Sequence, residues 1–169
     1  MIVSENYFYT VKDEFFTDYK NFLNCQFIDN KLECRPFYYP FEDRKTGLPW
    51  LIPLSTKIKT YEPKIEREVE KRGFCDGYHI IRNKDGSIYK IGGQEGVFLI
   101  LKMFPITKKY LKENYYFNTV PQRLVSENHI KPIDKKCNKM INLLKRGTLT
   151  RNDVDLFGLE QALLESLRI

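Results

Sequence analysis

The stretch that decides the fold reads PWLIPLSTKIK and runs from Pro49 to Lys59. Its first half is a short apolar run, which is typical of a buried β-strand. Two hydroxyl side chains, Ser55 and Thr56, and the cation of Lys57 follow at once. A rigid strand that ends in small polar and basic groups presents them together at the rim of a sheet. The stretch therefore predicts a buried strand whose end is suited to binding phosphate.

The residues before this strand show aromatic β patterns and one helical pattern. We expect a strand over residues 7–11, a helix over 12–23 and a strand over 32–39. The last of these would pair with residues 50–54 through the turn-prone residues 43–49. The first third of the chain thus predicts a strand, a helix and a hairpin.

The middle of the chain continues the β pattern. Residues 63–73 carry charges of alternating sign and predict a short exposed helix or an ordered loop. An Asp-Gly pair within 83–86 predicts a tight turn between strands over 74–82 and 87–91. The most apolar run, 97–103, predicts the central strand.

Beyond Pro105 the apolar residues recur at helical spacing. We expect a helix that begins at Pro121 and is broken or kinked at Pro132, and then a final amphipathic helix. Thr150 would cap that last helix, with Asp153 in its first turn. The fold class is therefore α+β: a compact curled antiparallel sheet or small barrel, with packed helices and a helical C-terminal third. Residues 1–169 are expected to form one domain.

Composition and cysteine spacing exclude several classes of protein. The 169 residues are 42% hydrophobic and 30% charged, which excludes a wholly disordered chain. No apolar run approaches the roughly 20 residues of a membrane span, and the N-terminus lacks the order of a signal peptide, so we expect a soluble cytoplasmic protein. The cysteines at 25, 34, 75 and 137 lack zinc-site spacing. We expect buried or half-buried free thiols and no metal.

The positive charge is concentrated in one part of the chain. Residues 102–151 hold twelve Lys and Arg against three Asp and Glu, whereas residues 1–101 are balanced. A basic surface with interleaved aromatic rings suits RNA, because cations neutralise phosphates while rings stack on unpaired bases. A solvated lysine face over helices is the alternative interpretation. The basic residues are Lys102, Lys108, Lys109, Lys112, Arg123, Lys131, Lys135, Lys136, Lys139, Lys145, Arg146 and Arg151.

The common enzyme motifs are missing. Residues 92–96 are rich in glycine but lack the lysine of a phosphate-binding loop, so they predict a turn. The only histidines are His79 and His129, too few for a histidine metal triad. Both are expected to be structural, with His79 as an alternative acid or base.

Five short segments follow one another in a distinctive order: FYT at 8–10, RPF at 35–37, IPLSTK at 52–57, LKMFPI at 101–106, and a basic helical tail. In order and spacing they resemble the toxins of type III toxin-antitoxin systems, the ToxN, AbiQ, CptN and TenpN group of bacterial endoribonucleases. The resemblance runs through nearly the whole chain.

This resemblance implies a barrel-like fold similar to the MazF and Kid toxins, and RNA cleavage without a metal or other cofactor. It also implies inhibition by a small repeated RNA that folds into a pseudoknot, within a closed assembly of toxin and RNA. The partners would be this antitoxin RNA and the substrate RNA, with no DNA and no membrane.

The matching motif implies that Ser55, Thr56 and Lys57 are catalytic, with Arg35 as a basic residue near them. Ser55 and Thr56 would hydrogen-bond the scissile phosphate, and Lys57 would stabilise the charge of the phosphorane. Arg35 would bind a neighbouring phosphate oxygen. The family's PLTSPK form has one more proline before its lysine, so either Lys57 or Lys59 would be the catalytic lysine.

Two further points concern RNA contacts. Phe15 stands where some members of the family have a tyrosine, and Tyr9 is an alternative, either as an RNA contact or as a core residue. The 2′-hydroxyl of RNA would attack the adjacent phosphate and leave 2′,3′-cyclic phosphate and 5′-hydroxyl ends. A non-catalytic RNA-binding module is the alternative function, and a protein-binding scaffold is a third. The predicted RNA-binding residues are Tyr9, Lys59, Lys102, Lys108, Lys109, Lys112, Arg123, Lys131, Lys135, Lys136 and Lys139.

Overall fold

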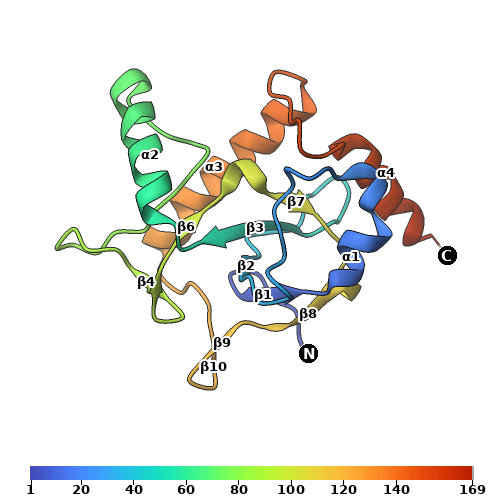
Figure 1. Cartoon of the computed structure of the whole chain (residues 1–169), viewed down its shortest axis with the longest axis horizontal. Coiled ribbons are helices and arrows are strands. Elements are labelled where there is room, and N and C mark those ends of the chain that lie inside the picture. Colours follow the sequence, from blue (N-terminus) through green and yellow to red (C-terminus); the bar gives the residue numbers. More distant parts are fainter. Residues whose placement is uncertain (169) are drawn as a thin grey trace.

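The computed structural model describes residues 1–168, and an antiparallel sheet lies at its centre (Figure 1). The strand order is β6-β3-β2-β1-β8, and β7 also pairs with β3. These strands are β1 (Phe8–Val11), β2 (Phe37–Tyr38), β3 (Trp50–Ser55), β6 (Val97–Phe98), β7 (Phe104–Pro105) and β8 (Leu111–Asn114).

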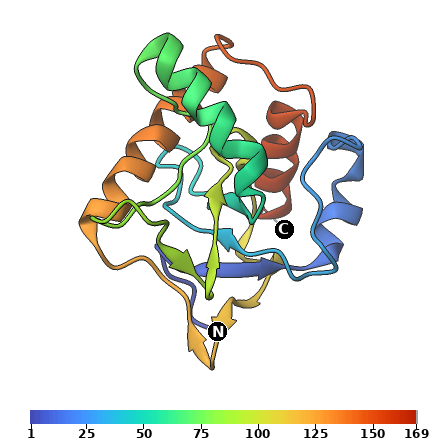
Figure 2. The same ribbon diagram turned by 60° about the vertical axis from the view of Figure 1, so that its left-hand side comes forward.

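Within residues 1–168, two small hairpins and four α-helices surround this sheet (Figure 2). The hairpins are β4 (Lys90–Ile91) with β5 (Gln94–Glu95), and β9 (Tyr116–Phe117) with β10 (Val120–Pro121). The helices are α1 (Asp13–Asp18), α2 (Ile58–Arg72), α3 (Glu127–Lys145) and α4 (Leu156–Ser166). Single 3-10 turns are η1 (Lys20–Phe22), η2 (Ile100–Lys102) and η3 (Lys108–Tyr110). None of the helices within residues 1–168 is long and apolar enough to cross a membrane.

The sheet separates two hydrophobic clusters. Successive side chains on a strand point to opposite faces, so Leu51 and Ile52 belong to different clusters. The cluster of Ile52 also holds Ile133 of α3, and that of Leu51 holds Leu159 of α4. Helices α3 and α4 therefore cover different sides of the sheet, as Figure 2 shows. All of β3 is buried between them.

The prediction of an α+β fold with an antiparallel sheet is confirmed, and so are the strands expected over 7–11 and 50–54. The pairing of β2 with β3 confirms the predicted hairpin. The helix expected over 12–23 is divided into α1 and η1. The strand expected over 32–39 is reduced to β2, because residues 31–33 have positive φ angles that no strand contains.

The sheet is open, so the expectation of a closed small barrel is wrong, and the likeness to MazF and Kid stays a prediction. The apolar run 97–103 is not a central strand but is divided into β6 and η2 beside β3. Pro53 explains the break. Its carbonyl accepts from Leu99 N at 2.9 Å, but it has no N–H to return to the ladder.

The predicted helices are present, but they begin and end at other residues than predicted. Residues 63–73 belong to the longer helix α2, and α3 begins at Glu127 rather than at Pro121. Helix α3 continues through Pro132, which lies in its second turn. Helix α4 is capped by Asp155, whose side chain accepts from Gly158 N at 3.0 Å, and not by Thr150.

The tight turn predicted at 83–86 is confirmed, since Asn83 N donates to Ser87 O at 2.8 Å. The flanking strands are shorter than predicted, because residues 74–82 contribute only isolated bridges.

Candidate active site at the end of strand β3

A pocket of about 210 Å³ lies where β3 ends, and we call it the β3-end pocket. Four segments form it: residues 31–36, the end of β3, the β4–β5 hairpin and Tyr115. Three predicted catalytic residues line it together, namely Arg35, Ser55 and Thr56. The chain thus brings residues that are 20 positions apart in the sequence to one small polar cavity.

Ser55 and Lys57 define the turn from strand to helix. The buried Ser55 accepts a hydrogen bond at its Oγ from Lys57 N at 3.2 Å, which leaves its O–H free to donate. Lys57 is the N-cap residue of α2 and its side chain is exposed, outside the residues that line the pocket. Lys59 is exposed in the first turn of α2. Both lysines are therefore exposed and lie outside the residues that line the pocket.

Arg35 lies at the pocket with its side chain only 6% exposed. Its Nη1 donates to Leu54 O at 2.7 Å and its Nε donates to Asp29 O at 2.8 Å. Nη2 lies 3.3 Å from Asp29 Oδ1. The sequence predicts a phosphate contact, yet most donors of this guanidinium fix the end of β3 to residues 29–35. Its first effect is therefore to position the strand end.

The β4–β5 hairpin closes the pocket on another side, and its turn confirms the prediction for residues 92–96. Gly92 and Gly93 have φ angles of 61° and 74°. A Cβ on Gly92 would lie 2.6 Å from the Tyr115 ring, so the hairpin packs directly on this tyrosine. Tyr115 and Glu95 line the pocket, and sequence reasoning did not place either of them there. The adjacent glycines Gly92 and Gly93 are the one local sequence feature consistent with a bulky side chain packed against this turn.

Tyr9 is a core residue and not part of the site. Its side chain is 0% exposed, and its hydroxyl donates to Ser4 O at 3.1 Å and accepts from Ser4 N at 2.8 Å. Burial raises the pKa of its phenol. The prediction of Tyr9 as an RNA contact is wrong for this fold, because no atom of the ring reaches the surface.

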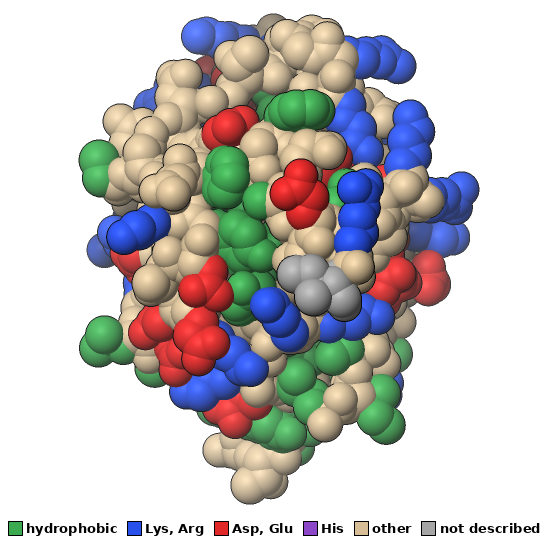
Figure 3. Space-filling view, turned by 90° about the vertical axis from the view of Figure 1, so that its right-hand side faces the viewer, with side chains coloured by type: hydrophobic (Ala, Val, Ile, Leu, Met, Phe, Trp, Pro, Cys, Tyr) green, Lys and Arg blue, Asp and Glu red, His purple; other side chains and the backbone are tan. Residues whose placement is uncertain are grey.

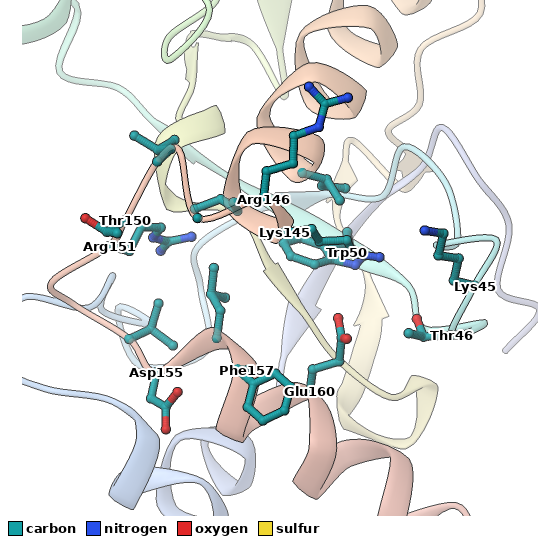
Figure 4. A pocket seen from close by; sticks show the side chains of 16 residues that line it. Lys45, Thr46, Trp50, Lys145, Arg146, Thr150, Arg151, Asp155, Phe157 and Glu160 are labelled. Atoms are coloured by element: carbon teal, nitrogen blue, oxygen red, sulfur yellow. The ribbon is translucent and has the colours of Figure 1, made fainter.

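A larger pocket of about 780 Å³ lies at the other end of β3, beside Trp50 (Figure 4). Its walls are mainly apolar, with Lys45, Lys145, Arg146 and Glu160 among its polar lining. It brings none of the predicted catalytic residues together. The smaller β3-end pocket is the better candidate, because it brings Arg35, Ser55 and Thr56 together.

The arrangement of the whole chain is found among solved structures. One is a structure of a bacterial type III toxin-antitoxin system, with selective toxin inhibition by a non-coding RNA pseudoknot. It matches 95% of this chain and 90% of that chain at 16% identity, with a TM-score of 0.56. The chain has the fold of a type III toxin.

A second structure with this fold comes from a bacterial antiviral system that a processed non-coding RNA regulates. It matches 92% of this chain and 95% of that chain at 13% identity, with a TM-score of 0.57. No protein-family model and no curated protein matches the sequence. Likeness at these identities establishes a shared fold, and function then depends on the site.

The predicted RNA-binding lysines belong to several elements of this fold, namely α2, η2, η3, β8 and α3. One group lies on α3, where Lys131, Lys135, Lys136 and Lys139 line a hollow of about 620 Å³ beside Phe74. Lys139 Nζ lies 4.3 Å from the centre of the Phe74 ring, which is 40% exposed. Asp76 also lines this hollow, with its Oδ2 2.6 Å from Lys139 Nζ. The remaining lysines beside an exposed ring suit a phosphate chain and an unstacked base.

The predicted cations on other elements are mostly paired as well, with acidic or aromatic side chains. Lys102 lies 3.7 Å from Asp153, Lys108 lies 2.8 Å from Glu42, and Lys112 lies 2.8 Å from Glu33. The Lys109 and Arg123 charges lie over the rings of Tyr110 and Tyr7. On the side that carries α1 and α4, Figure 3 shows basic and acidic side chains interspersed around an apolar centre.

His79 lies apart from the β3-end pocket. It is bridged to Phe98 of β6, and its Nδ1 lies 2.9 Å from Lys136 Nζ. Burial, together with the Lys136 charge, lowers the pKa of His79 to about 3. The expectation of a structural histidine agrees with this position. Among residues 1–168, no three His, Cys, Asp or Glu side chains gather in a way that would hold a metal ion.

The cysteines differ in exposure. Cys75 and Cys137 are buried as expected, but Cys25 and Cys34 are exposed. Cys34 lines the β3-end pocket.

Proposed function

We propose that this chain is a metal-independent endoribonuclease toxin of a type III toxin-antitoxin system. The observation that carries the proposal is the convergence of Arg35, Ser55 and Thr56 in the β3-end pocket of a chain with a type III toxin fold. The fold alone does not imply an activity, but this pocket brings together hydrogen-bond donors and positive charge that can stabilise a phosphorane without a metal. One domain, formed by residues 1–169, would carry the activity.

The proposed reaction uses the nucleophile that RNA itself carries. The 2′-oxygen forms a bond to the adjacent phosphorus and loses its proton, while the bond from phosphorus to the 5′-oxygen breaks and that oxygen gains a proton. The products are a 2′,3′-cyclic phosphate and a 5′-hydroxyl end. DNA lacks the 2′-hydroxyl and would not be cut.

The predicted catalytic residues have separate roles in this reaction. The hydroxyls of Ser55 and Thr56 donate to the scissile phosphate, and Lys57 or Lys59 reaches over the rim to stabilise the pentacoordinate phosphorus. Arg35 holds the strand end in place through Leu54 O and adds positive charge beside the phosphate. The N-terminal end of α2, which follows Thr56, also favours an anion.

The RNA is proposed to extend from this pocket over the basic residues of the molecule. The α3 hollow with Phe74 would hold part of the substrate or of a repeated pseudoknot antitoxin, in a closed assembly of toxin and RNA. Because lysines would neutralise phosphates there, affinity should fall as the salt concentration rises. The cytoplasm, where bacterial RNA lies, is the proposed location.

The first test is induced expression in bacteria of the wild type and of Lys57→Ala, Lys59→Ala and Lys84→Ala, with total RNA mapped for 5′-hydroxyl ends. Lys84 is an exposed lysine of the 83–86 turn and serves as the matched control. We expect growth arrest and new ends for the wild type and Lys84→Ala, and neither for the variant that lacks the catalytic lysine. Intact RNA in the wild type would refute the proposal.

Cleavage is separated from binding in vitro with purified protein. Ser55→Ala combined with Lys57→Ala should abolish cutting while RNA is still retained on a filter. Cutting by the wild type should persist in EDTA, which tests metal independence. Binding without cutting by the wild type would instead favour the RNA-binding module.

A further inference from the structure

Residues 30–35 form a turn whose backbone conformation is unusual for these residue types. Lys31, Leu32 and Glu33 have φ angles of 46°, 56° and 64°. Cys34 N donates to Asn30 O at 3.2 Å, which closes one turn of left-handed helix. Left-handed conformation is strained for residues other than glycine and rarely extends beyond a single position. Such an outlier persists only where its surroundings hold it, and it points to function.

Three side chains of the turn hold it in place from three directions. Asn30 Nδ2 donates to Val11 O at 2.7 Å and to Asp13 Oδ1 at 2.8 Å. Glu33 accepts from Asp13 N at 2.7 Å and from Lys112 Nζ at 2.8 Å. Arg35 ties the turn to the end of β3, as described above. The turn is therefore fixed to β1, to α1, to β8 and to the strand end that carries Ser55.

The remaining side chains of the turn have no comparable structural role and face solvent. Lys31 and Leu32 are exposed, and the Leu32 side chain is 89% exposed. Lys31 and Cys34, on either side of Leu32, both line the β3-end pocket. A single exposed leucine is ordinary by itself. An exposed leucine on a strained turn, between two residues that line the β3-end pocket, is not.

We propose that Lys31 and Leu32 determine which nucleotides beside the cleavage site are accepted at the β3-end pocket. This inference rests on the proposed function. Lys31 binds the phosphate next to the scissile one. Leu32 packs against a base that has left its stack, so the base preference beside the cut depends on this apolar contact. Single-stranded RNA is the partner that fits, because its bases are free to turn toward an apolar side chain.

The test compares full-length wild type with Leu32→Asn, Lys31→Asn and Leu167→Asn. Asparagine tolerates positive φ, so the turn keeps its shape while the side chain changes. Leu167 is 59% exposed at the end of α4 and provides the matched control. The substrate is single-stranded RNA with a randomised stretch, and the readouts are kcat/KM and the bases found beside new 5′-hydroxyl ends.

We expect Leu32→Asn to lower kcat/KM about tenfold and to broaden the base preference at one position beside the cut. Lys31→Asn should raise KM and reduce the salt dependence of binding. Leu167→Asn should match the wild type. Leu32→Gly should lower kcat/KM without lowering Tm, because glycine relieves the strain at φ 56°. A purely structural role would lower Tm as well.

Two results would overturn the inference, and they differ from a failure of the proposed function. If Leu32→Asn and Lys31→Asn cut RNA at the wild-type rate and with the wild-type base preference, the turn does not select the step. If the wild type cuts no RNA, the proposed function fails, and fluorescence anisotropy with labelled single-stranded RNA tests the turn alone. Equal affinity of the wild type and both variants would then reject it.

Discussion

Strand β3 and helix α2 follow one another in the chain and differ completely in their packing. All six residues of β3 are buried, and the strand pairs with β2 on one side and with β6 and β7 on the other. None of the 15 residues of α2 is buried, and this helix projects from the body of the molecule in Figure 1. Thr56 and Lys57 lie where the two elements meet.

This contrast divides the candidate site into a fixed part and an adjustable part. Ser55 belongs to β3 and is held by the sheet, whereas Lys57 and Lys59 are carried at the start of a helix with few contacts. A ring pair between Tyr61 and Tyr78 and the ion pair of Glu62 with Arg82 connect α2 to residues 78–82. Stability should therefore depend on β3, and the rate of cleavage on the lysines that α2 carries.

The largest expected effect is a loss of stability from a truncation within β3. Ile52→Ala should lower the free energy of unfolding by about 2–5 kcal/mol, because it leaves a cavity in a fully buried cluster. Val69→Ala in α2 is the matched truncation at a half-exposed site and should change it by less than about 0.5 kcal/mol. Urea unfolding measures both. Equal losses would mean that α2 is as tightly packed as β3.

The next largest effect is on the cleavage rate, with stability unchanged. Loss of the catalytic lysine by Lys57→Ala should lower the single-turnover rate by about 10²–10³-fold, as the removal of one transition-state donor does elsewhere. Its Tm should stay unchanged, because the side chain is exposed. Lys59→Ala in the same assay identifies which lysine acts. A lowered Tm for Lys57→Ala would contradict the division between the fixed and adjustable parts.

Arg35 sharpens the comparison because it should affect both quantities. Arg35→Met removes the donor to Leu54 O and leaves buried oxygens unpaired, which should cost about 1–3 kcal/mol of stability. The rate should fall with it, since the strand end loses its anchor. Thermal unfolding and single-turnover cleavage of one preparation give both values. A change in rate alone would instead assign Arg35 a direct phosphate contact.

The smallest effect is a pH dependence from His79, which lines a hollow of about 520 Å³ beside α2. Its pKa is about 3 in the fold and near 6.5 when unfolded. Between these values the unfolded chain binds more protons, so stability falls as pH drops below about 6.5. Asp134, whose pKa burial raises to about 6, acts in the opposite direction.

The variant His79→Gln isolates the histidine contribution, because glutamine keeps an acceptor for Lys136 and does not titrate. The wild type should lose about 2 kcal/mol more than this variant between pH 7 and pH 5. Unfolding curves at the two pH values measure the difference. Identical losses would show that folding leaves the pKa of His79 near its ordinary value.

Local sequence chemistry predicted the part of the site that lies on one continuous segment. An apolar run that ends in Ser-Thr-Lys is sufficient to predict β3 and the polar groups at its end. Arg35 came only from the resemblance, and its partners depend on how residues 29–35 fold back on β3. Tyr115 and Glu95 reach the pocket through tertiary packing, which no local pattern encodes.

The errors also have particular causes. Tyr9 and Phe8 are neighbours on β1 and point to opposite faces of the sheet. Both faces of that strand are buried, so alternation along the strand could not show which side chains reach solvent. Residues 31–33, which have positive φ angles, include no glycine, proline or asparagine, so the sequence does not predict a left-handed turn there. The split of residues 97–103 follows from Pro53 on the neighbouring strand, and the run itself contains no breaker.

The four thiols differ in exposure, so the rate at which they are alkylated can report whether RNA occupies the β3-end pocket. Cys34 is accessible at the β3-end pocket, Cys25 is accessible elsewhere, and Cys75 and Cys137 are shielded. Alkylation of the native protein should therefore label two positions, and RNA in the pocket should slow the reaction at Cys34 while leaving Cys25 as the reference within the same chain. Mass spectrometry of the labelled peptides would follow this footprint without any engineered probe.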